Sequence, residues 1–197
     1  MKRLLSSVRG TGWSRATSML LTVTLLAATL TWAVPVASQS VASEQSIKAA
    51  YLYKFADYVE WPPEVLKDPA VPLTIGVVGA DSLARELEEM THGRTAHGRP
   101  ILVRRVGPRD SLAGMHVLFV GSAETGDLPD LTTAARKHAV LLVTETSDAL
   151  ELGSVINFRA INQRIRFEIS LDSADRSGLK LSARLLAVAV HVQPRQH

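Results

Sequence analysis

Histidines are the residues best suited to metal chemistry in this sequence, and their spacing does not favour a metal site. His92 and His97 lie five residues apart in a loop that has two glycines and no carboxylate. That spacing corresponds to no helical geometry that would join them on one ion. His116 begins an apolar stretch, where a histidine is usually buried in the core with its ring nitrogens hydrogen-bonded. Since the chain also has no cysteine, we expect no zinc site and no other metal site.

Sequence motifs for cofactor binding and catalysis are equally weak. Gly76 and Gly79 stand between a predicted strand and a predicted helix, but they do not form GxGxxG, and no phosphate-binding lysine follows. Ser122 follows an apolar stretch without a GxSxG elbow, which favours a turn. Glu88 and Glu89 are adjacent on a predicted helix, so they point in different directions and indicate a solvated face. We therefore expect no catalytic residues and no cofactor.

An aromatic cluster is more informative. Five of the aromatic residues of the chain fall between residues 51 and 61. Tyr51, Phe55 and Tyr58 recur at helical spacing and predict a core face, whereas Tyr53 points elsewhere. Core packing explains most of the cluster, and a surface for a partner or a ligand is the alternative. On that alternative, Tyr53 and Trp61 are the contacts.

A charged strand is the second informative feature. Apolar and polar residues alternate strictly over 164–171. One face of this strand is therefore predicted to be buried in the core, and the other to be exposed to solvent or in contact with a partner. The polar face is either solvated or a charged docking patch, with Arg184 near it in the second case. The candidate partner-binding residues are thus Tyr53, Trp61, Arg164, Arg166, Glu168 and Arg184.

The N-terminus has the three parts of a secretory signal peptide. A basic segment precedes an apolar stretch at 19–34, and small residues follow at 36–38 and again at 41–43. We expect a cleaved signal peptide over 1–38 and one domain over 39–197; an uncleaved anchor is the alternative. No Arg-Arg pair precedes the apolar stretch, which favours a Sec-type route. The expected compartment is the periplasm.

The net charge changes once this segment is removed. Four of the 22 lysines and arginines lie in residues 1–38, whereas all 19 acidic residues follow them. The mature chain would therefore carry 18 basic and 19 acidic residues. Such a balance gives no electrostatic case for binding nucleic acid.

Hydrophobic periodicity then predicts the elements that position these residues. The expected strands are 73–78, 101–106, 116–120 and 139–144, followed by the pair 155–158 and 164–170. The expected helices are 44–60, 81–90, 128–138 and 179–191. In the last helix, the side chains expected to face the sheet are Leu181, Leu185, Val188 and Val192.

The order of these elements predicts an α/β fold. Three of the first four strands are almost continuously apolar, which fits a parallel sheet covered on both faces. The short connection at 160–163 allows only an antiparallel hairpin. Together they predict a three-layer α/β/α sandwich with a mostly parallel sheet and a C-terminal antiparallel hairpin.

Several stretches, taken in order along the chain, form a recognisable pattern. The first opens the domain at 47–55 and continues to Trp61-Pro62, and the middle of the chain follows it at 73–79, 98–101 and 116–120. The three most specific motifs are GSVINF at 153–158, RIRFEIS at 164–170 and GLKLSARLL at 178–186. Over about residues 45–192 the chain therefore resembles the YfiR-like family.

This resemblance implies a periplasmic α/β sandwich, often a homodimer, without known catalysis. It implies a negative regulator that binds the periplasmic domain of an inner-membrane diguanylate cyclase, holds it inactive and so lowers cyclic di-GMP and biofilm formation. An outer-membrane lipoprotein that sequesters the regulator is the second partner that the resemblance implies. An accessory role in another membrane system, or a small-ligand sensor with a pocket at the carboxyl ends of the strands, is the alternative.

The sequence departs from the family pattern at two places. Members often carry cysteines, one of them just before the third strand, where this chain has Met115 and no cysteine anywhere. The hairpin turn is often Asp-Gly in the family and is Asn162-Gln163 here, a pair that accommodates positive φ less easily.

Overall fold

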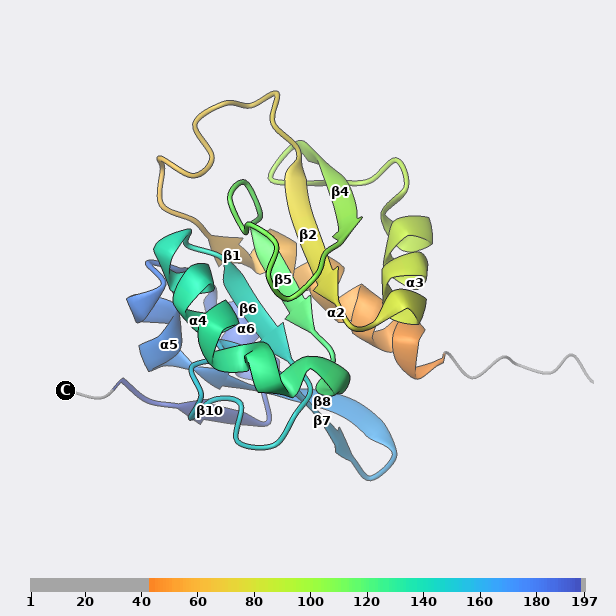
Figure 1. Cartoon of the computed structure of the whole chain (residues 1–197), viewed down its shortest axis with the longest axis vertical. Helices are drawn as coiled ribbons and strands as arrows, with labels where there is room; N and C mark the ends of the chain where they lie inside the picture. Colours follow the sequence, from red (N-terminus) through yellow and green to blue (C-terminus); the bar gives the residue numbers. More distant parts are fainter. Residues whose placement is uncertain (1–42, 196–197) are drawn as a thin grey trace, which may run out of the picture. The chain divides into compact units, whose positions relative to one another are not determined.

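The computed structural model describes residues 43–195 (Figure 1). The segment predicted as a signal peptide, 1–38, lies outside these residues. Within 43–195, no helix combines the length and the apolar character needed to cross a membrane.

The first helix, α2 (Glu44–Tyr58), confirms the prediction for this segment except at its end. The Ser43 hydroxyl accepts a hydrogen bond from the Ser46 N–H and so caps the first turn. Instead of continuing to residue 60, the chain becomes extended at β1 (Val59–Glu60), which pairs antiparallel with β9 (Lys180–Leu181). Trp61-Pro62 follows directly, as expected of a segment that cannot remain helical.

Eight strands form the main sheet, in the order β10-β8-β7-β6-β5-β2-β4-β3. They are β2 (Leu73–Val78), β3 (Thr95–Ala96), β4 (Arg99–Arg105), β5 (Val117–Val120), β6 (Leu141–Thr144), β7 (Ile156–Ile161), β8 (Arg164–Ser170) and β10 (His191–Gln193). The β7–β8 and β3–β4 pairs are antiparallel, and all other neighbours in this sheet are parallel. The mostly parallel sheet with its C-terminal hairpin is therefore confirmed.

Helices cover both faces of this sheet, as Figure 1 shows for α4 in front and α2 behind. Helix α3 (Asp81–Thr91) packs with α2 on one core cluster, which includes Leu83 and Leu87. Helix α4 (Leu128–Lys137) follows the 3₁₀ turn η1 (Ser122–Asp127) and buries Leu128 and Leu131 in a second cluster. The three-layer α/β/α arrangement is thus confirmed.

Four aromatic rings occupy the centre of the first cluster. Tyr51 and Phe55 of α2 meet Phe158 of β7 and Phe167 of β8, with ring centroids 5.0–5.9 Å apart. Phe55 and Phe167 are buried. Core packing therefore explains this part of the aromatic cluster, because such pairs add specific geometry to a large buried apolar area.

The predicted C-terminal helix at 179–191 is wrong. After α5 (Leu171–Arg176), the chain forms β9, the short helix α6 (Ala183–Val188) and β10. Leu185 is buried as expected, but Val188 is 57% exposed. The Val190 N–H donates to the Phe167 carbonyl (3.0 Å), so pairing with the open edge of β8 competes successfully with a longer helix. Alternating β-branched Val188, Val190 and Val192 are the strand signal at this position.

The β7–β8 turn places both of its residues in the left-handed region. Asn162 has φ 49° and Gln163 has φ 60°, as a two-residue turn of type I′ requires. Replacing Gln163 with glycine is expected to raise the free energy of unfolding by about 0.5–1 kcal/mol, because glycine adopts positive φ without steric cost. Urea unfolding measures the gain as a higher midpoint at unchanged slope. Gln163→Ala is the control and should give no gain; an equal gain from alanine would contradict the explanation.

Candidate functional site

A buried lysine marks the site where the carboxyl ends of the central strands meet the first turns of α2. Lys48 is 5% exposed, and its ammonium donates to Glu44 one turn earlier and to Glu145 Oε2 at 2.5 Å. Glu145 directly follows β6, and its other oxygen accepts from the Ser122 N–H (3.2 Å) at the end of β5. The lysine thus connects α2 to two neighbouring strands.

The two carboxylates keep Lys48 charged. Burial by itself lowers the pKa of this lysine, because it disfavours the charged form. Hydrogen bonds and charge attraction from Glu145 and Glu44 act in the opposite direction and leave the pKa raised above its ordinary value. The side chain is therefore an ammonium ion and not an amine nucleophile.

A cavity of about 260 Å³ opens beside this lysine. Lys48, Glu44, Glu145 and Ser122 line its polar end. Phe158, Ala160 and Ile165 of the hairpin lie on its wall too, and Arg159 completes that side. We refer to it as the Lys48 cavity; a cation with two carboxylates and an adjoining apolar surface is suited to binding and orienting a small polar molecule.

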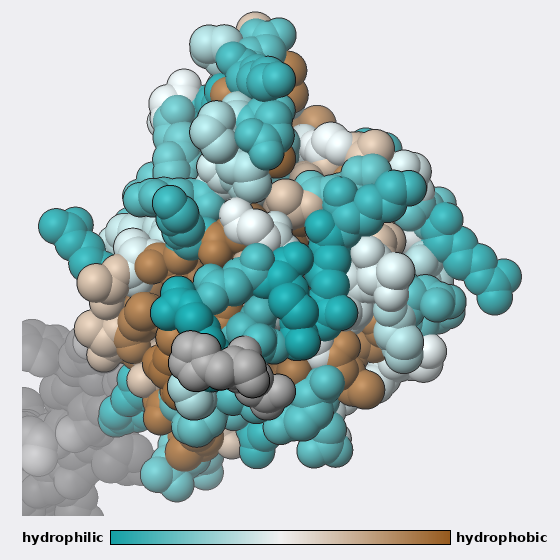
Figure 2. Space-filling model, turned by 90° about the vertical axis from the view of Figure 1, so that its left-hand side faces the viewer, coloured by the Kyte–Doolittle hydropathy of each residue, from teal (hydrophilic) through white to brown (hydrophobic). Residues whose placement is uncertain are grey.

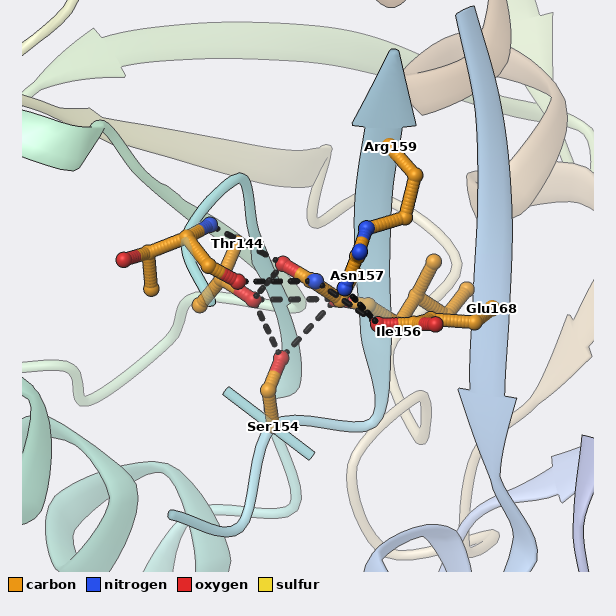
Figure 3. Close-up of polar contacts among 7 residues, drawn as sticks. Thr144, Ser154, Ile156, Asn157, Arg159 and Glu168 are labelled. Carbon is orange, nitrogen blue, oxygen red and sulfur yellow. Dashed lines mark hydrogen bonds and ion pairs between the residues drawn. The ribbon is translucent and has the colours of Figure 1, made fainter. Parts of the chain in front are cut away.

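A network of buried polar side chains lies next to the cavity, between β6, β7 and β8 (Figure 3). Asn157 Oδ1 accepts from the Thr144 hydroxyl (2.8 Å) and from the Thr146 N–H (3.1 Å). Its Nδ2 donates to the Thr146 carbonyl and to Glu168 Oε1, both at 2.9 Å. The Ser154 hydroxyl, 2.9 Å from Thr144 Oγ1, extends this Asn157 network. Four satisfied hydrogen bonds explain how an asparagine with no exposed surface is tolerated here.

On the predicted charged face of β8, the two arginines are exposed to solvent, whereas Glu168 is bonded to residues inside the protein. Arg164 and Arg166 are exposed on β8, on the side of the hairpin opposite Phe167. Glu168 belongs to the Asn157 network, and only 18% of its side chain is exposed. Its carboxylate also lies 3.5 Å from Arg159 on β7. The arginines are therefore accessible, whereas Glu168 mainly has internal partners.

The other predicted contacts are spread over the molecule. Trp61 is only 7% exposed and packs edge-on against His97 and His116, so the prediction of an accessible contact at Trp61 is wrong: its ring belongs to the core. Tyr53 is half-buried, with Lys54 and Arg94 over its ring. A partner contact at Tyr53 stays a prediction.

Arg184 is exposed on α6 and is separated from the arginines of β8. It lines a groove with Asp57 and Glu60. The neighbouring Leu185 packs into the α2 cluster, on the sheet face opposite the one that presents Arg164 and Arg166. The expectation that Arg184 lies near the charged strand face is therefore wrong, because α6 packs on the α2 side of the sheet.

His116 is a satisfied core histidine, as its position in the sequence indicates. It is 2% exposed, and its Nδ1 accepts from the Thr74 N–H (3.0 Å). Burial, with a smaller effect from the nearby Arg99 guanidinium, lowers its pKa. Among the residues that the structure describes, no group of three or more histidine, aspartate or glutamate side chains is placed to hold a metal ion.

Sequence reasoning missed Lys48, Glu145 and Asn157. One signal was present: Lys48 shares the buried face of α2 with Leu52 and Phe55, and a lysine on a core face implies an internal partner. Glu145 follows the apolar run of β6 directly, at the edge where ligands of α/β sheets bind. Their pairing could not be read, because they are 97 positions apart.

The fold and the site together define an α/β sandwich domain in which charged and amide side chains tie the first helix and the hairpin to the sheet. The chain belongs to the YfiR/HmsC-like family, whose model matches residues 45–190. This is a family of periplasmic regulators and not of enzymes.

A solved structure also shares the fold. It is a conserved domain protein from Vibrio cholerae O1 biovar El Tor, with a TM-score of 0.51 and 13% identity. The match covers 77% of this chain and 60% of that one, so this chain spans less than two thirds of that protein. At this identity the likeness concerns the fold alone.

Proposed function

We propose that the protein is a periplasmic negative regulator that binds the periplasmic domain of an inner-membrane diguanylate cyclase and lowers cyclic di-GMP. The observation that carries this proposal is the match to the YfiR/HmsC-like family over nearly the whole described domain. The secretory pattern of residues 1–38 agrees with it. The regulator acts by binding the inactive state of the cyclase more tightly than the active state, since only this difference shifts the equilibrium.

The exposed face of the β7–β8 hairpin is the contact surface that we propose. Arg159 lies opposite Arg166 across the hairpin, and Ile161 lies opposite Arg164. Like charges that face each other do not stabilise a strand pair, so the stability of the sheet does not explain these arginines. Ile161 is also 41% exposed. A basic surface with one exposed apolar side chain fits an acidic surface on the cyclase domain.

Large apolar patches offer no comparable alternative. Apart from Val188 and Val190, which lie two residues apart, the large apolar side chains that are exposed in residues 43–195 belong to separate segments: Val71, Leu102, Leu152 and Ile161. On the face shown in Figure 2, brown apolar patches alternate with teal polar residues. A charged contact is therefore the better supported mode of binding.

Charge reversal at two arginines tests this contact. The double variant Arg164→Glu/Arg166→Glu is expected to weaken binding to the purified periplasmic domain of the host's cyclase by roughly tenfold or more, and to reduce the salt dependence of binding. Biolayer interferometry at two salt concentrations measures both effects. Arg85→Glu, on the exposed side of α3, is the matched control and should bind like the wild type.

A cellular measurement accompanies the binding assay. Deleting the gene should raise cyclic di-GMP in the native host, and the wild-type gene, but not the double variant, should restore the lower level. An unchanged level of cyclic di-GMP in the deletion strain would contradict the proposed function. Equal affinities of the wild type and a folded double variant would contradict the proposed surface alone.

A further inference from the structure

We propose that the Lys48 cavity binds a small monocarboxylate, whose carboxylate takes the place of Glu44 beside the Lys48 ammonium. This ligand site shares Arg159 with the proposed hairpin surface but includes neither Arg164 nor Arg166, and it does not depend on the proposed cyclase partner.

The two carboxylates at Lys48 are held very differently. Only 19% of the Glu145 side chain is exposed, and the Ser122 N–H fixes its second oxygen. By contrast, Glu44 is the first residue of α2, and 57% of its side chain is exposed. Because the Glu44 carboxylate faces water, it can turn away from Lys48 and be solvated while Glu145 keeps the buried ammonium paired. Glu145 is therefore part of the site, and Glu44 occupies the position that a ligand can take.

The charge of the site determines the charge of the ligand. With Glu44 in place, one ammonium faces two carboxylates, and Glu145 always remains. A monoanion that replaces Glu44 leaves this balance unchanged, whereas a neutral molecule would leave Lys48 with one carboxylate fewer. Because a buried ammonium strongly requires charged partners, the site selects against neutral ligands.

The size and lining of the cavity define the rest of the ligand. A volume of about 260 Å³ equals the liquid volume of roughly nine water molecules, so a ligand with about six to nine non-hydrogen atoms fits. Ala160 and Ile165 lie opposite each other on the hairpin and line the cavity beside Phe158. A short hydrocarbon chain or a single aromatic ring can contact this wall while its carboxylate meets Lys48.

Location in the fold supports a ligand site. In parallel α/β sheets, ligands bind outside the carboxyl ends of the strands. Ser122 and Glu145 lie just beyond the carboxyl ends of β5 and β6, which are parallel neighbours. Lys48 reaches the same edge from α2 and brings a buried ammonium to the cavity, with the Arg159 guanidinium on the wall beside it.

Benzoate, hexanoate and butyrate are the probes, and benzamide is the uncharged analogue of benzoate. We expect the best of the three carboxylates to raise the melting temperature by about 3–6 °C at ten times its Kd, and benzamide to leave it unchanged. Isothermal titration at fixed ionic strength then gives Kd. No stabilisation by any of the three carboxylates, or equal stabilisation by benzamide, would overturn the proposal.

Variants locate the binding. Lys48→Gln should abolish carboxylate binding, with the exposed Lys54→Gln as its control. Because Lys48→Gln also removes two internal ion pairs and so destabilises the fold, two further variants keep the test decisive. Glu44→Gln removes the internal competitor and should strengthen binding severalfold. Ala160→Phe narrows the cavity at an exposed position, leaves Lys48 unchanged and should abolish benzoate binding. Unchanged affinity in both folded variants would show that the carboxylate binds elsewhere.

Discussion

Asn157→Ala is expected to lower the free energy of unfolding by about 3–4 kcal/mol. The amide makes four hydrogen bonds with Thr144, Thr146 and Glu168. Alanine would leave the N–H and the carbonyl of Thr146, together with the Glu168 carboxylate, without these partners. Each partly buried polar group that loses its partner costs about 1–3 kcal/mol.

The position of Asn157 in the sheet makes this loss important for the hairpin. β6 and β7 share only two register pairs, Val143 with Ile156 and Thr144 with Asn157. The Asn157 network therefore supplies much of what holds the β7–β8 hairpin to the central strands. Its removal is expected to loosen the surface that carries Arg164 and Arg166 as well as to destabilise the domain.

Urea unfolding measures the effect, with the exposed Ser147→Ala in the same connection as control. Asn157→Asp is a sharper probe, because it keeps the shape and replaces the NH₂ donor with an acceptor facing Glu168. This variant should be unstable at neutral pH and should recover part of its stability in acid, where the introduced carboxyl is protonated and can donate. A loss below about 1 kcal/mol for Asn157→Ala would mean that water replaces the amide.

Lys48→Met is expected to lower the free energy of unfolding by about 2–3 kcal/mol. Methionine keeps the apolar stem of lysine but leaves Glu145, which is largely buried, without its cation. The exposed Glu44 needs no partner, so the loss is smaller than for a fully buried triad. A double-mutant cycle with Glu145→Gln should give a coupling energy of about 1–2 kcal/mol, whereas the cycle with Lys54→Met should give none.

The stability difference between the wild type and Lys48→Met depends on pH with a definite sign. The pKa of Lys48 is raised above 10.5, so the folded state holds this proton more tightly than the unfolded state does. The stabilisation is complete below pH 10.5 and decreases as the pH rises through the higher folded-state pKa. The stability gap between the wild type and Lys48→Met should therefore be constant from pH 7 to 9 and shrink in strong alkali. A gap that stays constant in strong alkali as well would show that packing, and not charge, accounts for the effect.

Local sequence determined much of the scaffold. Ser43 begins α2, and Trp61-Pro62 ends the segment, because side-chain capping and proline act within a few residues. The apolar runs of β2, β5 and β6 predict buried parallel strands, since two covered faces leave no polar side to alternate with. The short connection at 160–163 specifies the hairpin even though Asn162-Gln163 is an uncommon pair for its turn.

Only the tertiary structure decided the C-terminus and the interior of the candidate site. Residues 190–193 join β8 because its edge offers unpaired backbone groups, and a local helical pattern carries no information about that edge. Lys48 meets Glu145, and Asn157 meets Glu168, only after the strands take their places in the sheet. Each residue type signals a need for a partner. The identity of that partner depends on strand order and register, which are set by the packing of the whole domain.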